Sequence, residues 1–151
     1  MTFTELCSVV LENNLGPIYH GGKWDGKTPI KMSRGSLGYG AYFTPSLEIA
    51  EYYAKENAGI VTQVNIDVRN PLVIKINSSS LEHPCVLALK LLGMPENNAV
   101  KLVERVEEMK GYMGKEISSR AIAAGYDGIY EFFNDKLREI VIWNSNKVTK
   151  I

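Results

Sequence analysis

The order of apolar and polar positions along the chain predicts a mixture of short strands and helices. Apolar residues near a 3.6-residue period predict helices, and short apolar or alternating runs between turn residues predict strands. Helices are expected at 4–13, 45–57, 81–93, 96–111 and 115–124. Strands are expected at 18–20, 41–43, 129–133, 137–143 and 147–151, with two more within 60–76. Because the strands are short and largely antiparallel, we predict an α+β fold with helices packed on the sheet faces.

Glycine, proline and small polar residues mark the predicted boundaries. Asn70-Pro71 divides the 60–76 segment into two strands, and Asn134-Asp135 is expected to turn a hairpin. Thr44 is the predicted N-cap of a helix, with Pro45 at its first position. Residues 23–40 contain four glycines and one proline, so we expect an exposed functional loop there.

Length and composition restrict the possible classes of protein but do not indicate a function. The 151 residues suit one domain, 1–151, with a single core. Lys+Arg and Asp+Glu are 17 each, so the formal net charge is zero, which argues against a strongly basic nucleic-acid surface over the whole domain. Cys7 and Cys85 are expected to be free thiols in a reducing cytoplasm. No stretch is typical of a signal peptide or a membrane span, so we expect a cytoplasmic protein.

Glu139 is the first candidate functional residue, because it interrupts an apolar strand. Alternation along a strand places Glu139 on the same face as Leu137 and Val141. The same alternation places Arg138 on the opposite face with Ile140. An acid among apolar side chains is costly unless it is hydrogen-bonded or lines a cleft. Two interpretations stay open: a strand-end carboxylate paired with a Lys or Arg, or a functional acid in a cleft.

Tyr42 and Tyr53 form the second candidate feature. Tyr42 ends a predicted strand, and Tyr53 lies on the helix that follows, on the same helix face as Ala50. That face turns back toward the strand, so the two rings would flank a slot for a planar ligand, which the small Ala50 would keep open. The alternative is a pair of core tyrosines.

His20-Gly21, at the end of the first predicted strand, is the third candidate feature. A glycine allows a ligand to approach the backbone closely. The backbone N–H and C=O of Gly21 would then be available to pair with a carboxamide. The alternative is a histidine that simply packs in the interior.

Four short segments resemble, in their order and spacing, the ADP-ribosyltransferase superfamily. They are Tyr19-His20-Gly21, Gly40-Ala41-Tyr42-Phe43-Thr44, Tyr53 and Glu139-Ile140-Val141-Ile142. The resemblance is to the His–Tyr–Glu branch, which includes diphtheria toxin and the poly(ADP-ribose) polymerases. In that branch one strand ends in His-Gly, another carries Gly-x-Tyr-Phe, an aromatic residue follows eleven residues later, and a late strand begins with Glu.

This resemblance implies an ADP-ribosyltransferase-like fold, in which two mostly antiparallel sheets form an NAD+-binding cleft with flanking helices. NAD+ would be the substrate, and no metal would be needed. Nicotinamide would lie between Tyr42 and Tyr53, with its carboxamide on the Gly21 backbone, and His20 would hydrogen-bond the adenosine ribose. Glu139 would accept a hydrogen bond from the nicotinamide ribose and stabilise the positive charge that develops there.

The chain departs from the family pattern at two positions. Ala50 stands where the polymerases carry a Ser that helps to bind the carboxamide, so NAD+ affinity is expected to be modest. Leu137 stands where relatives that modify arginine carry a second Glu, which argues against arginine as acceptor. Arg34 is the candidate diphosphate contact, with a solvated loop arginine as the alternative, and Ser33 and Ser36 are further candidates.

The activity implied by the resemblance is mono-ADP-ribosyl transfer to a protein or nucleic-acid acceptor, with protein favoured. Such a small domain suits a bacterial toxin or a factor in phage–host conflict. An NAD+ glycohydrolase, an inactive partner-binding module of the same fold, and a structural coat or scaffold protein are the alternatives. The acceptor is left open, and residues 23–38 and 81–113 are the segments expected to select it.

Overall fold

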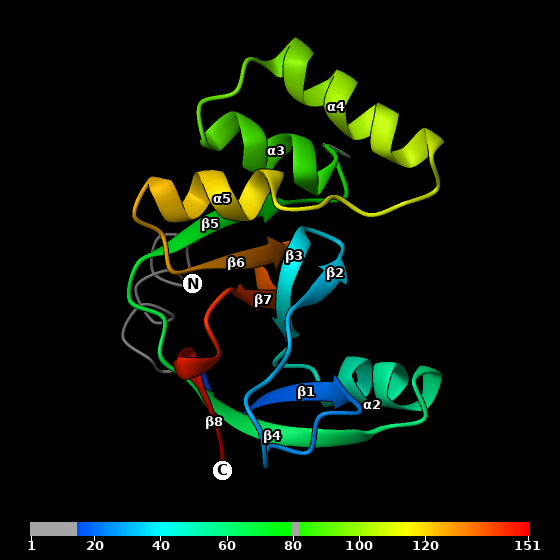
Figure 1. Cartoon of the computed structure of the whole chain (residues 1–151), viewed down its shortest axis with the longest axis vertical. Helices are drawn as coiled ribbons and strands as arrows, with labels where there is room; N and C mark the ends of the chain where they lie inside the picture. The colour runs from blue at the N-terminus through cyan, green and yellow to red at the C-terminus, as the bar shows by residue number, and fades with distance from the viewer. Residues whose placement is uncertain (1–14, 80–81) are drawn as a thin grey trace.

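The computed structural model describes residues 15–79 and 82–151, which form two sheets with helices on their outer sides (Figure 1). The larger sheet has the strand order β2–β3–β7–β6–β5 and the smaller one the order β1–β4–β8. The strands of the larger sheet are β2 (Ser33–Gly35), β3 (Gly38–Phe43), β5 (Pro71–Ile76), β6 (Gly128–Phe133) and β7 (Lys136–Ile142). Those of the smaller sheet are β1 (Ile18–Gly22), β4 (Ile60–Ile66) and β8 (Val148–Lys150).

Four α-helices lie within the described ranges, and they confirm the predicted α+β class. They are α2 (Leu47–Glu56), α3 (Pro84–Leu91), α4 (Glu96–Glu108) and α5 (Glu116–Ala123), with a short 3-10 turn at Ser145–Lys147. Helices α3 to α5 cover the outer face of the larger sheet, and α2 lies against the smaller sheet (Figure 1). Over these same ranges, no helix combines the length and apolar character needed to cross a membrane. The helix expected at 4–13, together with Cys7, lies outside the described residues.

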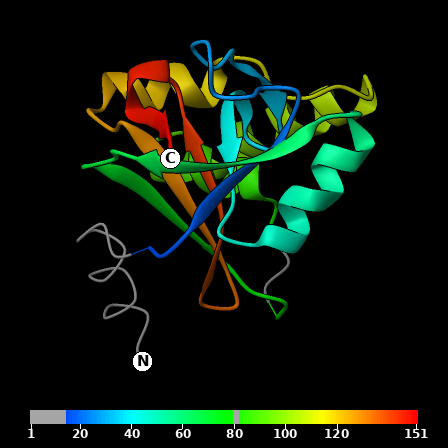
Figure 2. The same ribbon diagram turned by 90° about the horizontal axis from the view of Figure 1, so that it is seen from below.

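The larger sheet is buried on both faces. On one face Ile74 and Ile129 pack with Leu89 of α3 beneath the helices. On the other face Phe43 and Ile140 pack against the smaller sheet. Burying one such side chain contributes roughly 1.5–3 kcal/mol, so these two apolar layers are the main source of stability. Seen from below, α2 lies beside the paired strands β1 and β4 (Figure 2).

The strand pairs are antiparallel, as expected, except for one. β5 and β6 run parallel. The chain between them forms α3, α4 and α5, and parallel neighbours need a long crossover of this kind because a tight turn cannot join them. The predicted break at Asn70-Pro71 is confirmed, since β4 ends at Ile66 and β5 begins at Pro71 in the other sheet.

The helix after β3 begins two residues later than predicted. Its N-cap is Ser46, whereas the sequence suggested Thr44 as the cap and Pro45 as the first helical residue. The backbone N–H and C=O of Thr44 are both bonded to Tyr19 of β1, each at 2.9 Å. Thr44 therefore continues the strand and joins the two sheets. Its Oγ1 accepts a hydrogen bond from the backbone N–H of Ser46 and so supports the turn into α2.

The predicted face assignment on β7 is wrong near its start. Glu131 of β6 lies opposite Glu139, but the next residue, Phe132, lies opposite Leu137, so Arg138 is an extra residue in the ladder. This β-bulge shifts the alternation. Leu137 packs into the core between the sheets, and the Arg138 side chain turns to the carboxylate of Glu131.

The 23–40 segment is more ordered than the loop that its glycines suggested. It contains β2 and the first part of β3, which pair as an antiparallel hairpin. The turn of this hairpin, residues 35–38, approaches β7 through Ser36, whose hydroxyl reaches Glu139. Part of the expected loop therefore belongs to the larger sheet and helps to build the candidate site.

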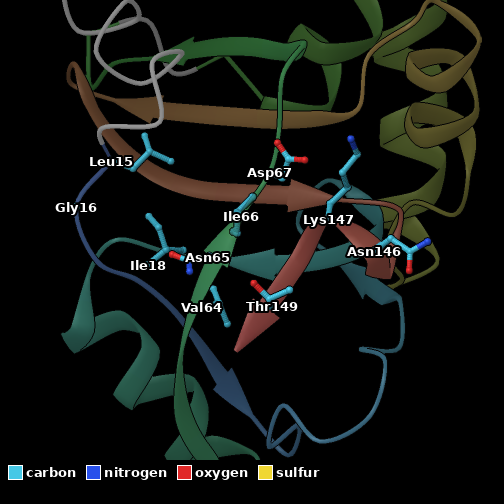
Figure 3. Close-up of a pocket in the computed structure, with 10 residues that line it drawn as sticks. All are labelled: Leu15, Gly16, Ile18, Val64, Asn65, Ile66, Asp67, Asn146, Lys147 and Thr149. Carbon is cyan, nitrogen blue, oxygen red and sulfur yellow. The ribbon is translucent and has the colours of Figure 1, made fainter. Parts of the chain in front are cut away.

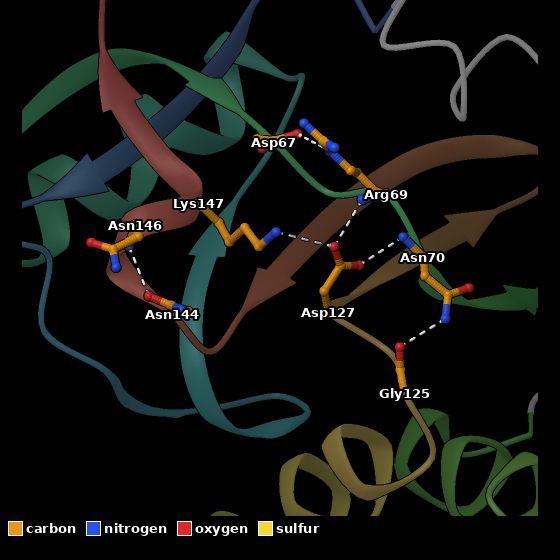
Figure 4. A network of polar contacts seen from close by, with 8 residues as sticks. All are labelled: Asp67, Arg69, Asn70, Gly125, Asp127, Asn144, Asn146 and Lys147. Atoms are coloured by element: carbon orange, nitrogen blue, oxygen red, sulfur yellow. Dashed lines mark hydrogen bonds and ion pairs between the residues drawn. The ribbon is translucent and has the colours of Figure 1, made fainter.

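A polar network ties the β4–β5 connection to the start of β6 (Figure 4). The carboxylate of Asp127 accepts hydrogen bonds from the backbone N–H groups of Arg69 at 2.9 Å and Asn70 at 2.8 Å. Lys147 approaches the same carboxylate at 3.5 Å. Burial opposes ionisation of Asp127, but these contacts together outweigh it and hold the pKa of this carboxyl below its ordinary value. The network anchors the chain where it passes from one sheet to the other.

Candidate functional site

The carboxylate of Glu139 lies where β7 passes the β2–β3 turn. Its Oε2 accepts a hydrogen bond of 2.8 Å from the Ser36 hydroxyl. Burial is the main reason why its pKa rises to about 7, and the carboxylate of Glu131 raises it further. The Ser36 hydrogen bond and the Arg138 guanidinium partly offset this rise. A half-buried acid with a near-neutral pKa is typical of functional sites, because burial without a compensating cation otherwise only costs stability.

Glu131, directly across from Glu139, is a buried acid that sequence reasoning missed. It is 1% exposed. Its Oε1 accepts hydrogen bonds from Arg138, at 2.7 Å from Nε and also from Nη2, whereas its Oε2 is buried without a hydrogen-bond partner. The available signal was a single acid within the apolar run GIYEFF of β6. Its partner Arg138 could not be assigned in advance, because the bulge turns that side chain onto this face.

Tyr42 holds the β2–β3 turn in place. Its hydroxyl accepts a hydrogen bond from the Leu37 N–H at 3.1 Å and donates one to the Gly38 carbonyl. Its ring lies so close to Gly35 that a Cβ there would be 2.6 Å from ring atoms. Burial raises the pKa of Tyr42 well above its ordinary value, so the phenol is neutral. The turn that Tyr42 braces is the one that presents Ser36 to the acid.

Tyr53 lies within α2, and it is 49% exposed. Burial raises the pKa of Tyr53, and the charge of Glu139 is the next cause. The same charge contributes to the raised pKa of Tyr42. Both aromatic residues predicted for the site are thus within electrostatic reach of the predicted acid. The Tyr53 ring also meets Tyr52 edge-on, with centroids 5.6 Å apart.

Ala50 and Gly21 form the contact between α2 and β1. Ala50 is fully buried, and a Cβ at Gly21 would lie 1.9 Å from its carbonyl oxygen. The close packing of α2 on β1 therefore requires a glycine at this position, whether or not a ligand approaches. Backbone groups of alternate strand residues point to the same edge. Since the N–H and C=O of Tyr19 bond to Thr44, those of Gly21 point along this same edge of β1.

His20 is anchored to the strand that carries Tyr42. Its Nδ1 lies 3.0 Å from the Tyr42 carbonyl oxygen, which can only accept, so Nδ1 carries the hydrogen. The ring packs against Trp24 and Phe43, with centroids 5.7 and 5.5 Å away. Burial lowers the pKa of His20. The ring is therefore neutral at pH 7, and its Nε2 is a hydrogen-bond acceptor.

Arg34 is exposed on β2 and extends toward the segment before α5. A Cβ at Gly114 would lie 3.8 Å from its Nη2 and 3.3 Å from Oε2 of Glu116. The guanidinium and this carboxylate thus lie close to the same glycine. Ser33 is also exposed on β2. The suggested diphosphate contacts of Arg34 and Ser33 stay predictions, and Ser36 is bonded to Glu139.

Two hollows in the described part of the chain lie away from these residues. One, of about 310 Å³, is lined by residues of the smaller sheet and the 3-10 turn, among them Ile18, Val64, Lys147 and Thr149 (Figure 3). The other, of about 520 Å³, lies between α3 and α4. Among the described residues, no group of three or more His, Cys, Asp or Glu side chains is placed to hold a metal ion. The candidate site is described instead by individual contacts: His20 to the backbone of Tyr42, Ser36 to Glu139, and the charge of Glu139 on Tyr42 and Tyr53.

The two sheets, joined at Thr44, form the α+β fold that the sequence motifs suggested. The predicted acid, the two tyrosines and the neutral histidine belong to β7, β3, α2 and β1 of this fold. A family described as ADP-ribosyltransferase in polyvalent proteins matches residues 14–151. The chain belongs to this family of ADP-ribosyltransferases, and membership implies NAD+ as its substrate.

Other comparisons add little to this assignment. No curated protein matches the chain. Among solved structures, the crystal structure of an anti-CRISPR protein is similar, with 18% sequence identity over 89% of this chain and 94% of that chain, and a TM-score of 0.39. A likeness this distant carries no argument about function.

Proposed function

We propose that this protein is a mono-ADP-ribosyltransferase of the His–Tyr–Glu type, in which Glu139 promotes cleavage of the nicotinamide–ribose bond of NAD+. The observation that carries the proposal is the placement of Glu139. This acid is half-buried and hydrogen-bonded to Ser36, and its charge acts on both Tyr42 and Tyr53. If this acid had no functional role, an apolar residue at its position would make the folded protein more stable.

In this proposal the aromatic residues and the first strand bind the nicotinamide end of NAD+. Tyr42 and Tyr53 would stack on the nicotinamide ring, and offset stacking is worth roughly 0.5–1.5 kcal/mol per pair beyond burial. The edge of β1 at Gly21 would receive the carboxamide. The neutral His20 ring, with Nε2 as an acceptor, suits a ribose hydroxyl as donor.

Glu139 supplies the electrostatic part of the reaction. When the bond between nicotinamide and ribose breaks, its electron pair leaves with nicotinamide and positive charge develops on the ribose carbon. A carboxylate held beside that carbon stabilises the charged transition state more than the ground state, which lowers the barrier. The acceptor's nucleophilic atom then bonds to the same carbon and loses its proton.

Nicotinamide release by the purified chain tests this proposal directly. The protein is incubated with NAD+ labelled in the adenylate half, with and without a cell lysate, and both free nicotinamide and labelled macromolecules are measured. We expect Glu139→Gln to lower the rate about 100- to 1,000-fold, as for loss of one preorganised electrostatic contact. The matched control is Glu104→Gln, an exposed acid of α4 at the rim of the hollow between α3 and α4.

NAD+ affinity, measured by calorimetry, should be similar in the wild type and both variants. Labelled macromolecules support transfer, whereas free ADP-ribose as the sole product points to an NAD+ glycohydrolase. A wild-type protein that releases no nicotinamide with lysate present contradicts the enzymatic proposal and favours a binding module. Equal rates in the wild type and Glu139→Gln contradict the role assigned to this acid.

A further inference from the structure

The acid proposed for catalysis is one of two carboxyl groups that face each other across neighbouring strands. Glu131 and Glu139 are register partners in the antiparallel β6–β7 pair. Directly opposite residues project to the same face with Cβ atoms about 4.5–5.5 Å apart, and like charges in such a pair are destabilising. An arrangement that brings two acids together in a largely buried place therefore needs something to relieve their repulsion.

The hydrogen bonds of the four carboxylate oxygens indicate what relieves it. Arg138 donates to Oε1 of Glu131, and Ser36 donates to Oε2 of Glu139. Oε2 of Glu131 is buried without a partner. Two ionised carboxylates have no hydrogen to give each other. One proton on Glu139 would instead be donated to the free oxygen of Glu131 and would satisfy it.

Other charged or titratable side chains around the pair change little near neutral pH. From α3, burial raises the pKa of the Cys85 thiol to about 12. From β3 and α2, the pKa values of Tyr42 and Tyr53 are also raised, so both phenols are neutral. Arg138 supplies a constant positive charge, and the carboxylates of Glu107 and Glu116 act on the Cys85 thiol. Among these groups, Glu139 is the one whose pKa lies near 7.

We propose that Glu131 is a positioning residue that shares one proton with Glu139. This sharing enables the Glu139 carboxylate to take up the proton that the acceptor molecule loses. The catalytic part of this inference rests on the proposed function. In that step the acceptor's lone pair bonds to the ribose carbon, the acceptor's X–H bond breaks, and its proton moves to Glu139. The nicotinamide–ribose bond breaks with its electron pair going to nicotinamide, and the X–H electron pair stays on the acceptor atom. The protonated Glu139 then donates to Oε2 of Glu131.

The coupling of the two acids is measurable without catalysis. Carbon-13 NMR of labelled glutamate carboxyl groups, in the full chain without NAD+, reports the midpoint of Glu139, whose signal is identified by its loss in Glu139→Gln. We expect a midpoint near 7 in the wild type. Glu131→Gln should lower it by at least about one pH unit, because the like charge is removed and the amide can donate to Glu139. Arg138→Gln should raise it, and the control Glu104→Gln should leave it unchanged.

The pH profile of nicotinamide release then tests the role in the reaction. The acidic limb of the profile should follow the NMR midpoint and move to lower pH in Glu131→Gln, a change that a merely structural role for Glu131 would not cause. A wild-type midpoint in the ordinary range near 4.3 overturns the inference even if Glu131→Gln does not fold. An unchanged midpoint in a folded Glu131→Gln also overturns it.

The proposed function and the coupling of the two acids can be contradicted separately. Nicotinamide release with no coupling between the acids removes this inference and leaves the proposed function intact. Coupling without nicotinamide release in any form of the protein overturns both the proposed function and the proton transfer assigned to the pair.

Discussion

Replacing Glu139 with glutamine is expected to stabilise the folded protein while it removes the activity. The pKa of Glu139 rises from an ordinary 4.5 to about 7 in the folded state, chiefly through burial. The folded chain therefore holds this proton more tightly than the unfolded chain does. For a group of this kind, the favourable contribution is fully present below the unfolded pKa and is lost as pH rises through the folded pKa. At pH 8 the ionised carboxylate is a net cost.

The size of this cost follows from the difference in pKa. A difference of about 2.5, at 1.36 kcal/mol for each pKa unit, gives an upper limit of about 3 kcal/mol above pH 7. Glutamine has nearly the same shape, its oxygen can still accept from Ser36, and its amide can donate to the free oxygen of Glu131. In a chain of this length, about 3 kcal/mol corresponds to roughly 6–12 °C in Tm.

Urea unfolding at pH 4.5, 6 and 8 measures the effect. The free energy of unfolding of Glu139→Gln should exceed that of the wild type by an amount that grows from pH 4.5 to about 7 and then levels off. The surface control Glu104→Gln should show no such growth. A Glu139→Gln protein that is equally or less stable than the wild type at pH 8 would refute the reasoning, because the carboxylate would then be well solvated or paired.

Three further predictions test other parts of the molecule. Gly21→Ala places a methyl group 1.9 Å from the Ala50 carbonyl, so we expect a loss of about 1–3 kcal/mol, or more where the backbone cannot shift, measured by thermal unfolding. Asp127→Asn should lower the free energy of unfolding by about 1.5–3 kcal/mol at pH 7. Because the pKa of Asp127 is lowered in the folded state, this difference should vanish as pH falls through the folded pKa. Unfolding measured at pH 7 and pH 3 checks this. Tyr53→Ala should weaken NAD+ binding about 2- to 12-fold in calorimetry while Tyr53→Phe retains it; equal affinity in all three proteins would remove Tyr53 from the site.

Elements with strong local signals were predictable from the sequence. The Asn134-Asp135 hairpin is an example, since both residues adopt the positive φ angles, 48° and 64°, that Asn and Asp tolerate well. The break at Asn70-Pro71 is another, because proline lacks a backbone donor and interrupts a strand. Such features depend on a few neighbouring residues, and the printed order of residues contains that information.

The candidate site was predictable only in part. The motif spacing pointed to Tyr42, Tyr53 and Glu139 as neighbours, and in the structure the charge of Glu139 acts on both tyrosines. The motifs contained no sign of the Glu131–Glu139 pair or of the Ser36–Glu139 hydrogen bond. Each of these contacts joins residues of different strands or turns, which are not neighbours in the sequence. The roles of these residues toward NAD+ stay predictions.

The sequence by itself determined the α+β class, the positions of most strands and helices, and the family-like motifs, because periodicity and turn chemistry act over a few residues. Tertiary structure alone decided which atoms meet. The pairing of Thr44 with β1 moved the start of α2, and the bulge at Arg138 turned a cation toward a buried acid. Register and burial depend on the whole sheet, and they set the pKa of Glu139, on which its proposed role depends.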